Sequence, residues 1–164
     1  MEVNYKGQVR AIVHQFEATP HQIERANYHA VNKVTRWAKT ILKRQIAQSS
    51  ELPVKLIQGR ILHFKFGGAL VKLWVGGEPI PVSRLNPKQQ KMGVKAGKLF
   101  FPGAFVAMKN VFQRSSDSRL PIEKVMYEYH DDVVVAMMEK LQPRLERKFF
   151  DTFERELKWQ TRTK

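Results

Sequence analysis

The run GVKAGKL, from Gly93 to Leu99, is the part of this sequence closest to a phosphate-binding loop, with two glycines and two lysines in seven residues. Such a loop surrounds a phosphate with backbone N–H groups and needs a Ser or Thr after its lysine to hold Mg²⁺. Here the spacing is one residue short, and Leu99 stands at the position of the hydroxyl. The run therefore does not predict a nucleotide-hydrolysing site.

The other groups with acid–base or metal-binding chemistry are scattered. Of the five histidines, only His21 and His29 could share a helix, and they are two turns apart, so they do not form a metal-binding pair. His130-Asp131-Asp132 sets a base beside two carboxylates, but capping at a strand-to-helix junction is the better interpretation. Glu123 and Glu128 have opposite parity along a strand, so they do not face each other. We expect no enzyme, no metal and no other cofactor.

Positive charge is the main chemical feature of the chain, with a formal net charge of +14. Residues 1–50 hold 8 Lys or Arg against 3 acids, residues 51–121 hold 12 against 3, and residues 122–164 hold 9 against 9. Clustered cations attract a polyanion or an acidic protein face. A well-solvated basic surface is the alternative interpretation.

Two groups of basic residues are candidates for such a contact. One group lies on a predicted helix, and the other lies in segment 86–98, whose Gly, Lys and Gln content is typical of a long exposed loop. We expect DNA or an acidic partner to meet these side chains: Arg36, Lys39, Lys43, Arg44, Lys88, Lys91, Lys95 and Lys98.

Basic and aromatic residues also interleave at 63–66 and 98–101. These side chains could stack exposed bases, but packing of half-buried strand faces is the better interpretation because such strands alternate with period two. The chain lacks cysteine, which excludes zinc fingers, and it has no RNP-like or helix-turn-helix signature.

The N-terminal stretch reads as helix. Thr19-Pro20 followed by Gln22 has the form of a capping box with proline at the first helical position, so a helix is predicted from there to about Gln48. A short helix is predicted before it, from Gln8 to Phe16, and Ser49-Ser50 with Pro53 mark the break. The apolar stripe of the long helix is Ile23, Ala26, Ala30, Val34, Trp37 and Ile41.

The middle of the chain reads as a small antiparallel sheet. Runs 61–66 and 69–75 are β-rich and flank Gly67-Gly68, a hairpin signal. Pro79 and Pro81 are expected to stop regular pairing. Runs 105–108 and 111–114 predict a hairpin that turns around Lys109-Asn110, and 122–129 predicts a further strand.

The C-terminal stretch predicts a helix that Asp131 or Asp132 caps. Pro143 lacks an N–H and clashes with the preceding turn, so we expect a kink or two successive helices. The fold class is therefore α+β: a long N-terminal helix, a small central antiparallel sheet with long loops, and a kinked C-terminal helix. We expect a single domain, 1–164, with stretches 1–50, 51–129 and 130–164.

Length and composition set the remaining expectations. A chain of 164 residues can bury about 70% of its unfolded surface, so it needs no disulfide or metal. The absence of cysteine is compatible with folding in a reducing cytoplasm. No apolar run approaches the roughly 18 residues that a membrane span requires, and no signal peptide is visible.

An ordered series of short pieces between Leu73 and Val125 resembles the phage minor tail protein Z family, the tail completion proteins of long-tailed phages. The series covers about 50 residues, and the helical flanks agree in layout and basic character. The chain departs from the pattern at Gly77, where a leucine is expected, and at the short turn Lys109-Asn110. The pieces are Trp74-Val75-Gly76, Pro79-Ile80-Pro81, Arg84-Leu85, Gly93 and Gly97, Phe101-Pro102-Gly103-Ala104-Phe105, Val111-Phe112-Gln113-Arg114 and Arg119-Leu120-Pro121-Ile122.

The resemblance implies a structural virion protein at the head-proximal end of the tail or the neck, made in the host bacterial cytoplasm. It implies α+β subunits that form a ring, a hexamer if it matches tail symmetry, and that help tail maturation, head–tail joining and DNA positioning. The implied partners are further copies of the chain, neighbouring proteins such as the tail terminator, and packaged DNA, without a membrane or a small-molecule substrate. Helix 131–160 and the sheet edges would supply the heterologous contact. The alternative is a free basic nucleic-acid-binding module.

Overall fold

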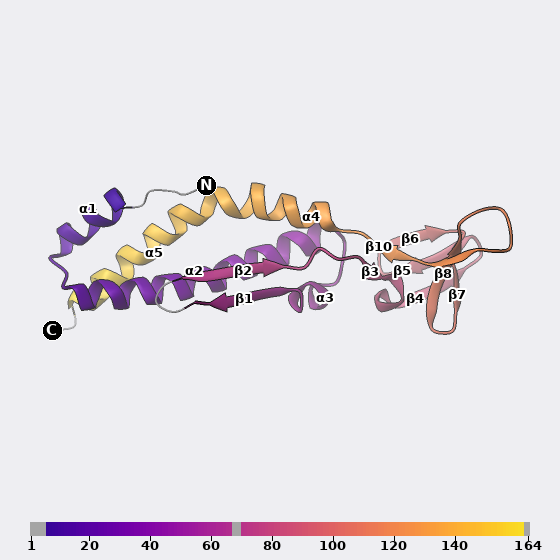
Figure 1. Cartoon of the computed structure of the whole chain (residues 1–164), viewed down its shortest axis with the longest axis horizontal. Helices are drawn as coiled ribbons and strands as arrows, with labels where there is room; N and C mark the ends of the chain where they lie inside the picture. Colours follow the sequence, from indigo (N-terminus) through magenta and orange to yellow (C-terminus); the bar gives the residue numbers. More distant parts are fainter. Residues whose placement is uncertain (1–5, 67–69, 163–164) are drawn as a thin grey trace. The chain divides into compact units, whose positions relative to one another are not determined.

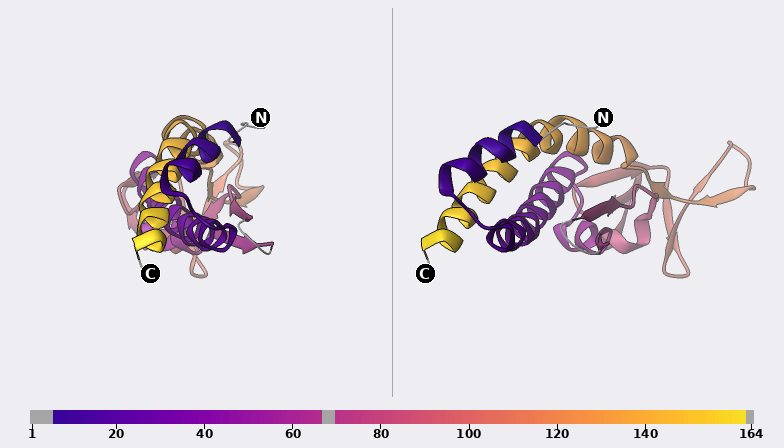
Figure 2. Two further views of the ribbon diagram at one scale, coloured as in Figure 1. Left: turned by 90° about the vertical axis from the view of Figure 1, so that its left-hand side faces the viewer. Right: turned by 60° about the vertical axis from the view of Figure 1, so that its left-hand side comes forward.

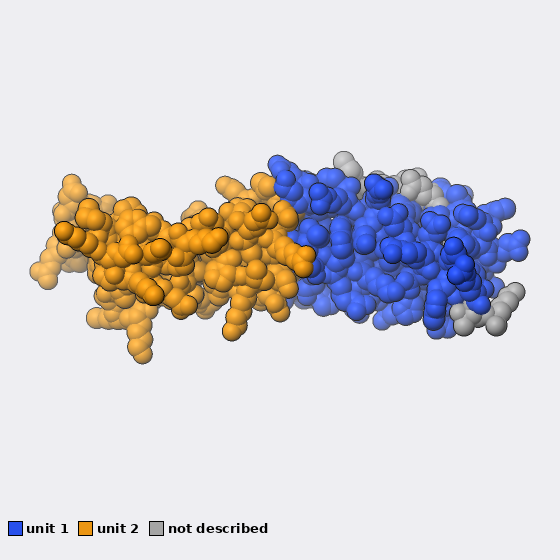
Figure 3. Space-filling model, turned by 180° about the vertical axis from the view of Figure 1, so that it is seen from behind, with its two compact units in different colours: residues 1–42, 62–74, 137–164 blue, residues 43–61, 75–136 orange. Residues whose placement is uncertain are grey.

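The computed structural model describes residues 6–66 and 70–162, and the chain groups into two compact units (Figure 3). Unit 1 contains the described residues of 1–42, 62–74 and 137–164, and unit 2 contains 43–61 and 75–136. The predicted α+β class is confirmed, with a long N-terminal helix, small antiparallel sheets and an interrupted C-terminal helix (Figure 1). The single domain stays a prediction.

The two N-terminal helices are confirmed as α1, Lys6–Phe16, and α2, Pro20–Ser49. The capping box is formed: the Thr19 N–H donates to Gln22 Oε1 at 2.9 Å, and the Gln22 N–H donates to Thr19 Oγ1 at 3.4 Å. Because these bonds satisfy N–H groups that the helix itself cannot, they define where α2 begins.

The buried stripe of α2 differs in part from the predicted one. After Val34 the stripe continues at every fourth residue, whereas the predicted Trp37 and Ile41 are only partly buried. Three of the buried positions are alanines and three are larger aliphatic side chains, and the alanines let the neighbouring elements pack close to the helix. They are Ala26, Ala30, Val34, Ala38, Leu42 and Ile46.

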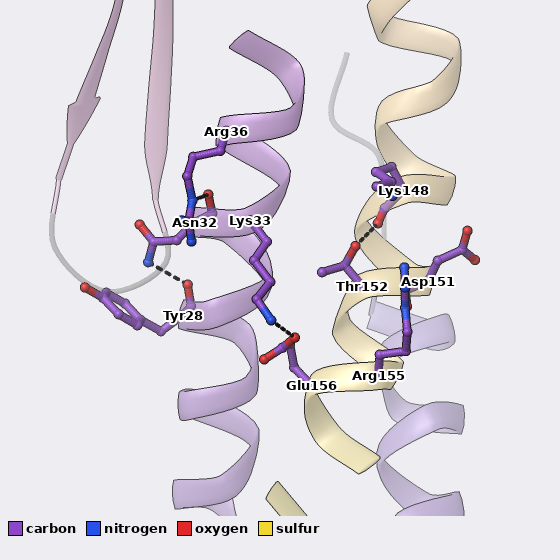
Figure 4. A network of polar contacts seen from close by, with 9 residues as sticks. All are labelled: Tyr28, Asn32, Lys33, Arg36, Lys148, Asp151, Thr152, Arg155 and Glu156. Atoms are coloured by element: carbon purple, nitrogen blue, oxygen red, sulfur yellow. Dashed lines mark hydrogen bonds and ion pairs between the residues drawn. The ribbon is translucent and has the colours of Figure 1, made fainter. Parts of the chain in front are cut away.

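The core of unit 1 forms where α1 and α5, Gln142–Arg162, meet the start of α2. Phe153 and Leu157 of α5 are buried against Ala26 and Ala30, and the apolar side of α1 packs on the same cluster. Figure 2 shows α1 alongside α5 in both views. Lys33 Nζ of α2 adds an ion pair to Glu156 Oε1 at 2.6 Å, but this lysine is about half exposed, so the pair contributes little to stability (Figure 4).

Strands β1, Ile61–Lys65, and β2, Val71–Val75, form a two-stranded sheet. Beyond them the Phe66 N–H donates to the Leu70 carbonyl at 3.1 Å. The predicted turn at Gly67-Gly68 and the first residue of the predicted run 69–75 lie outside the described residues.

Unit 2 contains short strands in three sheets, the end of α2, and two short helices, α3, Val54–Gln58, and α4, His130–Val135. β4 (Pro87–Gln90), β5 (Gly93–Ala96) and β6 (Leu99–Pro102) form one sheet, and β7 (Phe105–Ala107), β8 (Asn110–Arg114) and β9 (Ile122–Lys124) form a second. β3 (Ile80–Pro81) pairs with β10 (Met126–Tyr127), and a 3-10 turn follows at Val82–Leu85.

Four predictions for this region need correction. Segment 86–98 is not a long loop, because it forms β4, β5 and both tight turns beside β5. Pro81 does not stop pairing but lies opposite Met126. The predicted hairpin is present, but its turn is Met108-Lys109, both left-handed, one residue earlier than expected. The predicted strand 122–129 is divided between β9 and β10, which belong to different sheets.

A buried tyrosine organises one part of unit 2. The Tyr129 hydroxyl donates to the Gly76 carbonyl and accepts a hydrogen bond from Arg60 Nη1 at 3.1 Å, while the Arg60 guanidinium also lies over the Tyr129 ring. Since a buried hydroxyl without partners would be destabilising, these contacts explain why a tyrosine can be 2% exposed here.

The C-terminal helix is interrupted as predicted, but its start differs. α4, His130–Val135, leads into a π-helical segment, Ala136–Leu141, and α5 follows with Pro143 as its second residue. Pro143 has no N–H to donate to the preceding turn, so regular helical hydrogen bonding is interrupted there. The irregular segment lies just before this proline. Asp131 and Asp132 do not cap α4: they lie in its first turn, where acids favour the helix dipole, and Tyr129 is the N-cap.

Tyr127 gives unit 2 a pH-dependent contribution to stability. Its hydroxyl donates to the Ser50 carbonyl at 3.0 Å, and burial, followed by the negative charges of Asp132 and Glu51, raises the pKa of Tyr127. A raised pKa in the folded state stabilises the protein below the unfolded pKa near 10, and this contribution is lost as the pH rises through the folded value.

We therefore expect Tyr127→Phe to lower the free energy of unfolding by about 1 kcal/mol at pH 7, through the lost hydrogen bond. Above pH 10 the difference between the two proteins should shrink, because only the original protein loses stability from this group. Urea unfolding of both proteins at several pH values measures the difference; a constant gap from pH 7 to 11 would contradict it.

Candidate nucleic-acid interface

The eight predicted basic residues lie on one sheet and on helix α2. Lys88, Lys91, Lys95 and Lys98 gather on the sheet β4–β5–β6 of unit 2, which we call the lysine sheet. Arg36 and Lys39 lie on α2 in unit 1, and Lys43 and Arg44 lie on the part of α2 that belongs to unit 2. The structure thus brings the four lysines 88–98 together, but does not make one site of the α2 group.

Pairing in the lysine sheet sets two lysines side by side. Lys88 lies directly opposite Lys95, and Lys95 lies opposite Phe100 on the next strand, so the three side chains form one row across the sheet. Both lysines are exposed, and Phe100 is 47% exposed. Like charges at directly opposite positions destabilise a sheet. An anion bound across this row would therefore reduce the repulsion between the two lysines.

The two faces of the lysine sheet have different chemistry. The residues that share the face of Lys88 and Lys95 are Gln90, Gly93, Phe100 and Pro102, and none of them is acidic. On the other face Val94 and Ala96 of the central strand are buried, at 0% and 1% exposure, whereas Gln89 of the edge strand is exposed. One face therefore contributes to the core through β5, and the other presents cations beside an aromatic ring.

Tight turns place the two remaining lysines at opposite ends of β5. Lys91 lies in the turn between β4 and β5, and Lys98 lies in the turn between β5 and β6, after a left-handed Gly97. Gly93 packs directly on the next strand, where a Cβ would collide with the Phe101 carbonyl oxygen and lie 2.9 Å from the Pro102 Cα. This glycine serves close strand packing rather than phosphate binding, which agrees with the rejection of a phosphate-binding loop.

Arg36 and Lys39 line a hollow between α2 and β1, which we call the α2–β1 pocket, with a volume of about 450 Å³. Lys39 Nζ lies 3.3 Å from His63 Nδ1, and Lys65 Nζ lies 5.8 Å from the centre of the Tyr28 ring. Tyr28, Asn32 and Arg36 follow one another along the side of α2 next to the strands (Figure 4). The pocket is lined by Tyr28, His29, Asn32, Thr35, Arg36, Lys39, His63 and Lys65.

The predicted packing role of the interleaved aromatic residues is correct for only one ring. Phe101 packs edge-on against Tyr127 at 6.4 Å, but Phe64, Phe66 and Phe100 are about half exposed. In β1 the alternation directs His63 and Lys65 to the pocket and Phe64 to the opposite face. The alternation of basic and aromatic residues at 63–66 is visible in the sequence. Which of these side chains face the pocket depends on α2, which lies beside β1.

Some residues of the family-like series are buried or shape turns, and others are exposed. Leu85 and Ala104 are buried, Gly103 takes a left-handed turn, and the Pro102 carbonyl accepts a bond from Gln113 Nε2 at 3.1 Å. A Cβ on Gly77 would lie 2.7 Å from His130 Nδ1, so a larger side chain at this position would require His130 to move. The exposed members are Trp74, Pro79, Arg84, Gly97, Pro102, Gly103, Gln113, Arg114, Arg119, Leu120, Pro121 and Ile122.

His130 shares a pocket of about 570 Å³ with Glu78, Glu128 and Asp131. Among the described residues, no hydrogen bond or ion pair joins this imidazole to a carboxylate. Within 6–66 and 70–162, no three His, Asp or Glu residues are arranged to hold a metal ion. The expectation that the protein is not an enzyme stays a prediction.

No protein-family model, curated protein or solved structure matches the chain. None of the helices in the described part of the chain is long and apolar enough to cross a membrane.

Proposed function

We propose that the chain is a structural tail completion protein of a phage, located in the virion at the head-proximal end of the tail or in the neck. In this role it assembles as a ring, helps tail maturation and head–tail joining, and holds DNA. Two features support the proposal: the ordered series between Leu73 and Val125, which resembles the tail protein Z family, and the cationic sheet that this same segment builds.

The observation that carries the DNA contact is the row formed by Lys88, Lys95 and Phe100. Two exposed lysines on adjacent strands present two cations side by side to one DNA backbone, and phosphate contacts bind without regard to sequence. The face has no acid that would neutralise them or repel DNA. Sequence-independent binding is what a protein that holds any packaged DNA end requires.

Self-assembly has to overcome repulsion between copies with a net charge of +14. Residues 122–164 have balanced charge, and among the described residues no further strand pairs with β1 or β2. The strands of this sheet and the residues next to them also carry exposed apolar side chains, which a neighbouring copy would bury. They are Leu62, Phe64, Phe66, Leu70 and Trp74.

The test combines solution mass with virion assembly. The purified chain should form a ring of one defined mass by light scattering, and it should be found in purified virions. Replacing Lys88, Lys91, Lys95 and Lys98 by glutamate should abolish DNA-filled infectious particles without changing the circular dichroism. A monomer that binds nucleic acid with steep salt dependence and is absent from virions would instead establish the alternative, a free nucleic-acid-binding module.

A further inference from the structure

The α2–β1 pocket collects basic side chains from two elements that are distant in sequence. Arg36 and Lys39 come from α2, whereas His63 and Lys65 come from β1, and all four line the same hollow in unit 1. The basic surface of a solvated helix spreads its charges apart. Here the fold brings Lys65 and the imidazole of His63 from β1 beside the cations of α2.

The cations of this pocket have no acidic counterpart among its lining residues. In the described part of the chain, the ion pair that exists on α2 is Lys33 with Glu156, on the side toward α5 (Figure 4). Lys39 instead meets the ring nitrogen of His63, and Lys65 meets the face of Tyr28. Both contacts leave the positive charges uncompensated, so an anion in the pocket would be attracted by three permanent cations.

The number of cations indicates which anion fits. One guanidinium and two ammonium groups carry three positive charges, whereas a backbone phosphodiester carries a single negative charge. A phosphate monoester has three free oxygens and a charge of about −1.5 to −2 at neutral pH. The Tyr28 ring, 47% exposed at the same pocket, offers a surface for the base attached to that phosphate.

We propose that the α2–β1 pocket binds a phosphate monoester, either at the end of a DNA strand or on a free nucleotide. Arg36, Lys39 and Lys65 hold the phosphate oxygens, and Tyr28 stacks on the adjoining base. The proposal rests on the proposed function only in naming DNA as a source of the phosphate. The site itself consists of residues in unit 1, whereas the lysine sheet lies in unit 2.

The experiment compares two DNA duplexes of one sequence, with a 5′-phosphate or a 5′-hydroxyl, each labelled with fluorescein at a 3′ end. We expect the full chain to bind the phosphorylated duplex about tenfold or more tightly by anisotropy, because charge-assisted hydrogen bonds are involved. In a variant with Lys39→Gln and Lys65→Gln the preference should fall to about onefold. Lys72→Gln, an exposed lysine of β2 outside the pocket, should leave it unchanged.

The preference ratio separates this proposal from the proposed function. Lys88→Gln with Lys95→Gln should weaken binding of both duplexes but keep their ratio. Equal binding of the two duplexes by the original chain would overturn the pocket proposal, and so would an unchanged ratio in the folded pocket variant. Competition with AMP identifies the source of the phosphate. If AMP displaces the phosphorylated duplex at concentrations close to the Kd of AMP, the ligand is a free nucleotide, and if displacement needs higher concentrations, the ligand is a strand end. If AMP does not displace the duplex, the result contradicts the site.

Discussion

A chain with Lys88→Gln and Lys95→Gln is expected to bind duplex DNA on the order of 50-fold more weakly at 0.1 M salt, because each lost phosphate contact removes close to one unit from the salt slope. The slope of log Kd against log salt should fall by about 2. The same variant is expected to unfold no more easily than the original chain. Binding and stability should thus change in opposite directions.

The reason lies in the register of the lysine sheet. Lys88 and Lys95 are directly opposite and exposed, so in the free protein they repel each other across the strands. Removing the two charges should stabilise the sheet by about 0.2–1 kcal/mol. A solvated basic surface with no ligand would not require two lysines at opposed positions, since lysines elsewhere on the sheet would give the same solubility.

The matched control is Lys109→Gln with Lys124→Gln, which removes the same charge from the β7–β8–β9 sheet. Both lysines are exposed, and Lys124 lies opposite Phe112 rather than another cation. Anisotropy titrations at several salt concentrations and urea unfolding of all three proteins provide the comparison. If the control variant weakens DNA binding as much as the test variant, the loss of affinity comes from the lower net charge and not from the lysine sheet.

The helices of this protein could be predicted from sequence because their signals are local. Thr19 and Gln22 lie three residues apart, so the capping box that starts α2 is visible before folding. Pro143 likewise indicated the interruption near the start of α5. The predicted stripe erred at Trp37 and Ile41, because which side of a long helix is covered depends on the neighbours that reach each part.

The lysine sheet could not be predicted because its strands are only four residues long and rich in Lys and Gln. Such residues favour loops, and a four-residue strand shows too little alternation to be recognised. What stabilises β5 is non-local: Val94 and Ala96 are buried, and Gly93 permits close packing on Phe101. The lysines were identified as candidates, but their opposed register follows from pairing.

The α2–β1 pocket could be predicted from sequence even less than the lysine sheet. Arg36 and Lys39 were candidates on helix geometry alone, while His63 and Lys65 were noted only as part of an alternating strand. The two pairs are 24 or more residues apart, and the contact of Lys39 with His63 joins them. No local signal specifies which face of a strand will meet a helix.

Phe153→Ala is expected to have the largest effect on stability of any change considered, a loss of about 3–5 kcal/mol in the free energy of unfolding. Phe153 is 1% exposed, stacks on Phe149 at 5.9 Å and fills the space that Ala26 and Ala30 leave on α2. Its partners on α2 are alanines, which are too short to fill the space that the ring would leave. Glu154→Ala, on the exposed side of the same turn, should change the value by less than about 0.5 kcal/mol.

The shape of the unfolding curve tests the single-domain prediction with the same variant. Phe153 belongs to unit 1, but α2 is one uninterrupted helix whose residues 20–42 lie in unit 1 and 43–49 in unit 2. Leu42 and Ile46 are both fully buried on either side of that boundary, so melting α2 in one unit should remove core from the other. We therefore expect Phe153→Ala to shift one cooperative urea transition, with circular dichroism and tryptophan fluorescence coinciding. Two separated transitions, of which only one moves, would show that the units are independent domains.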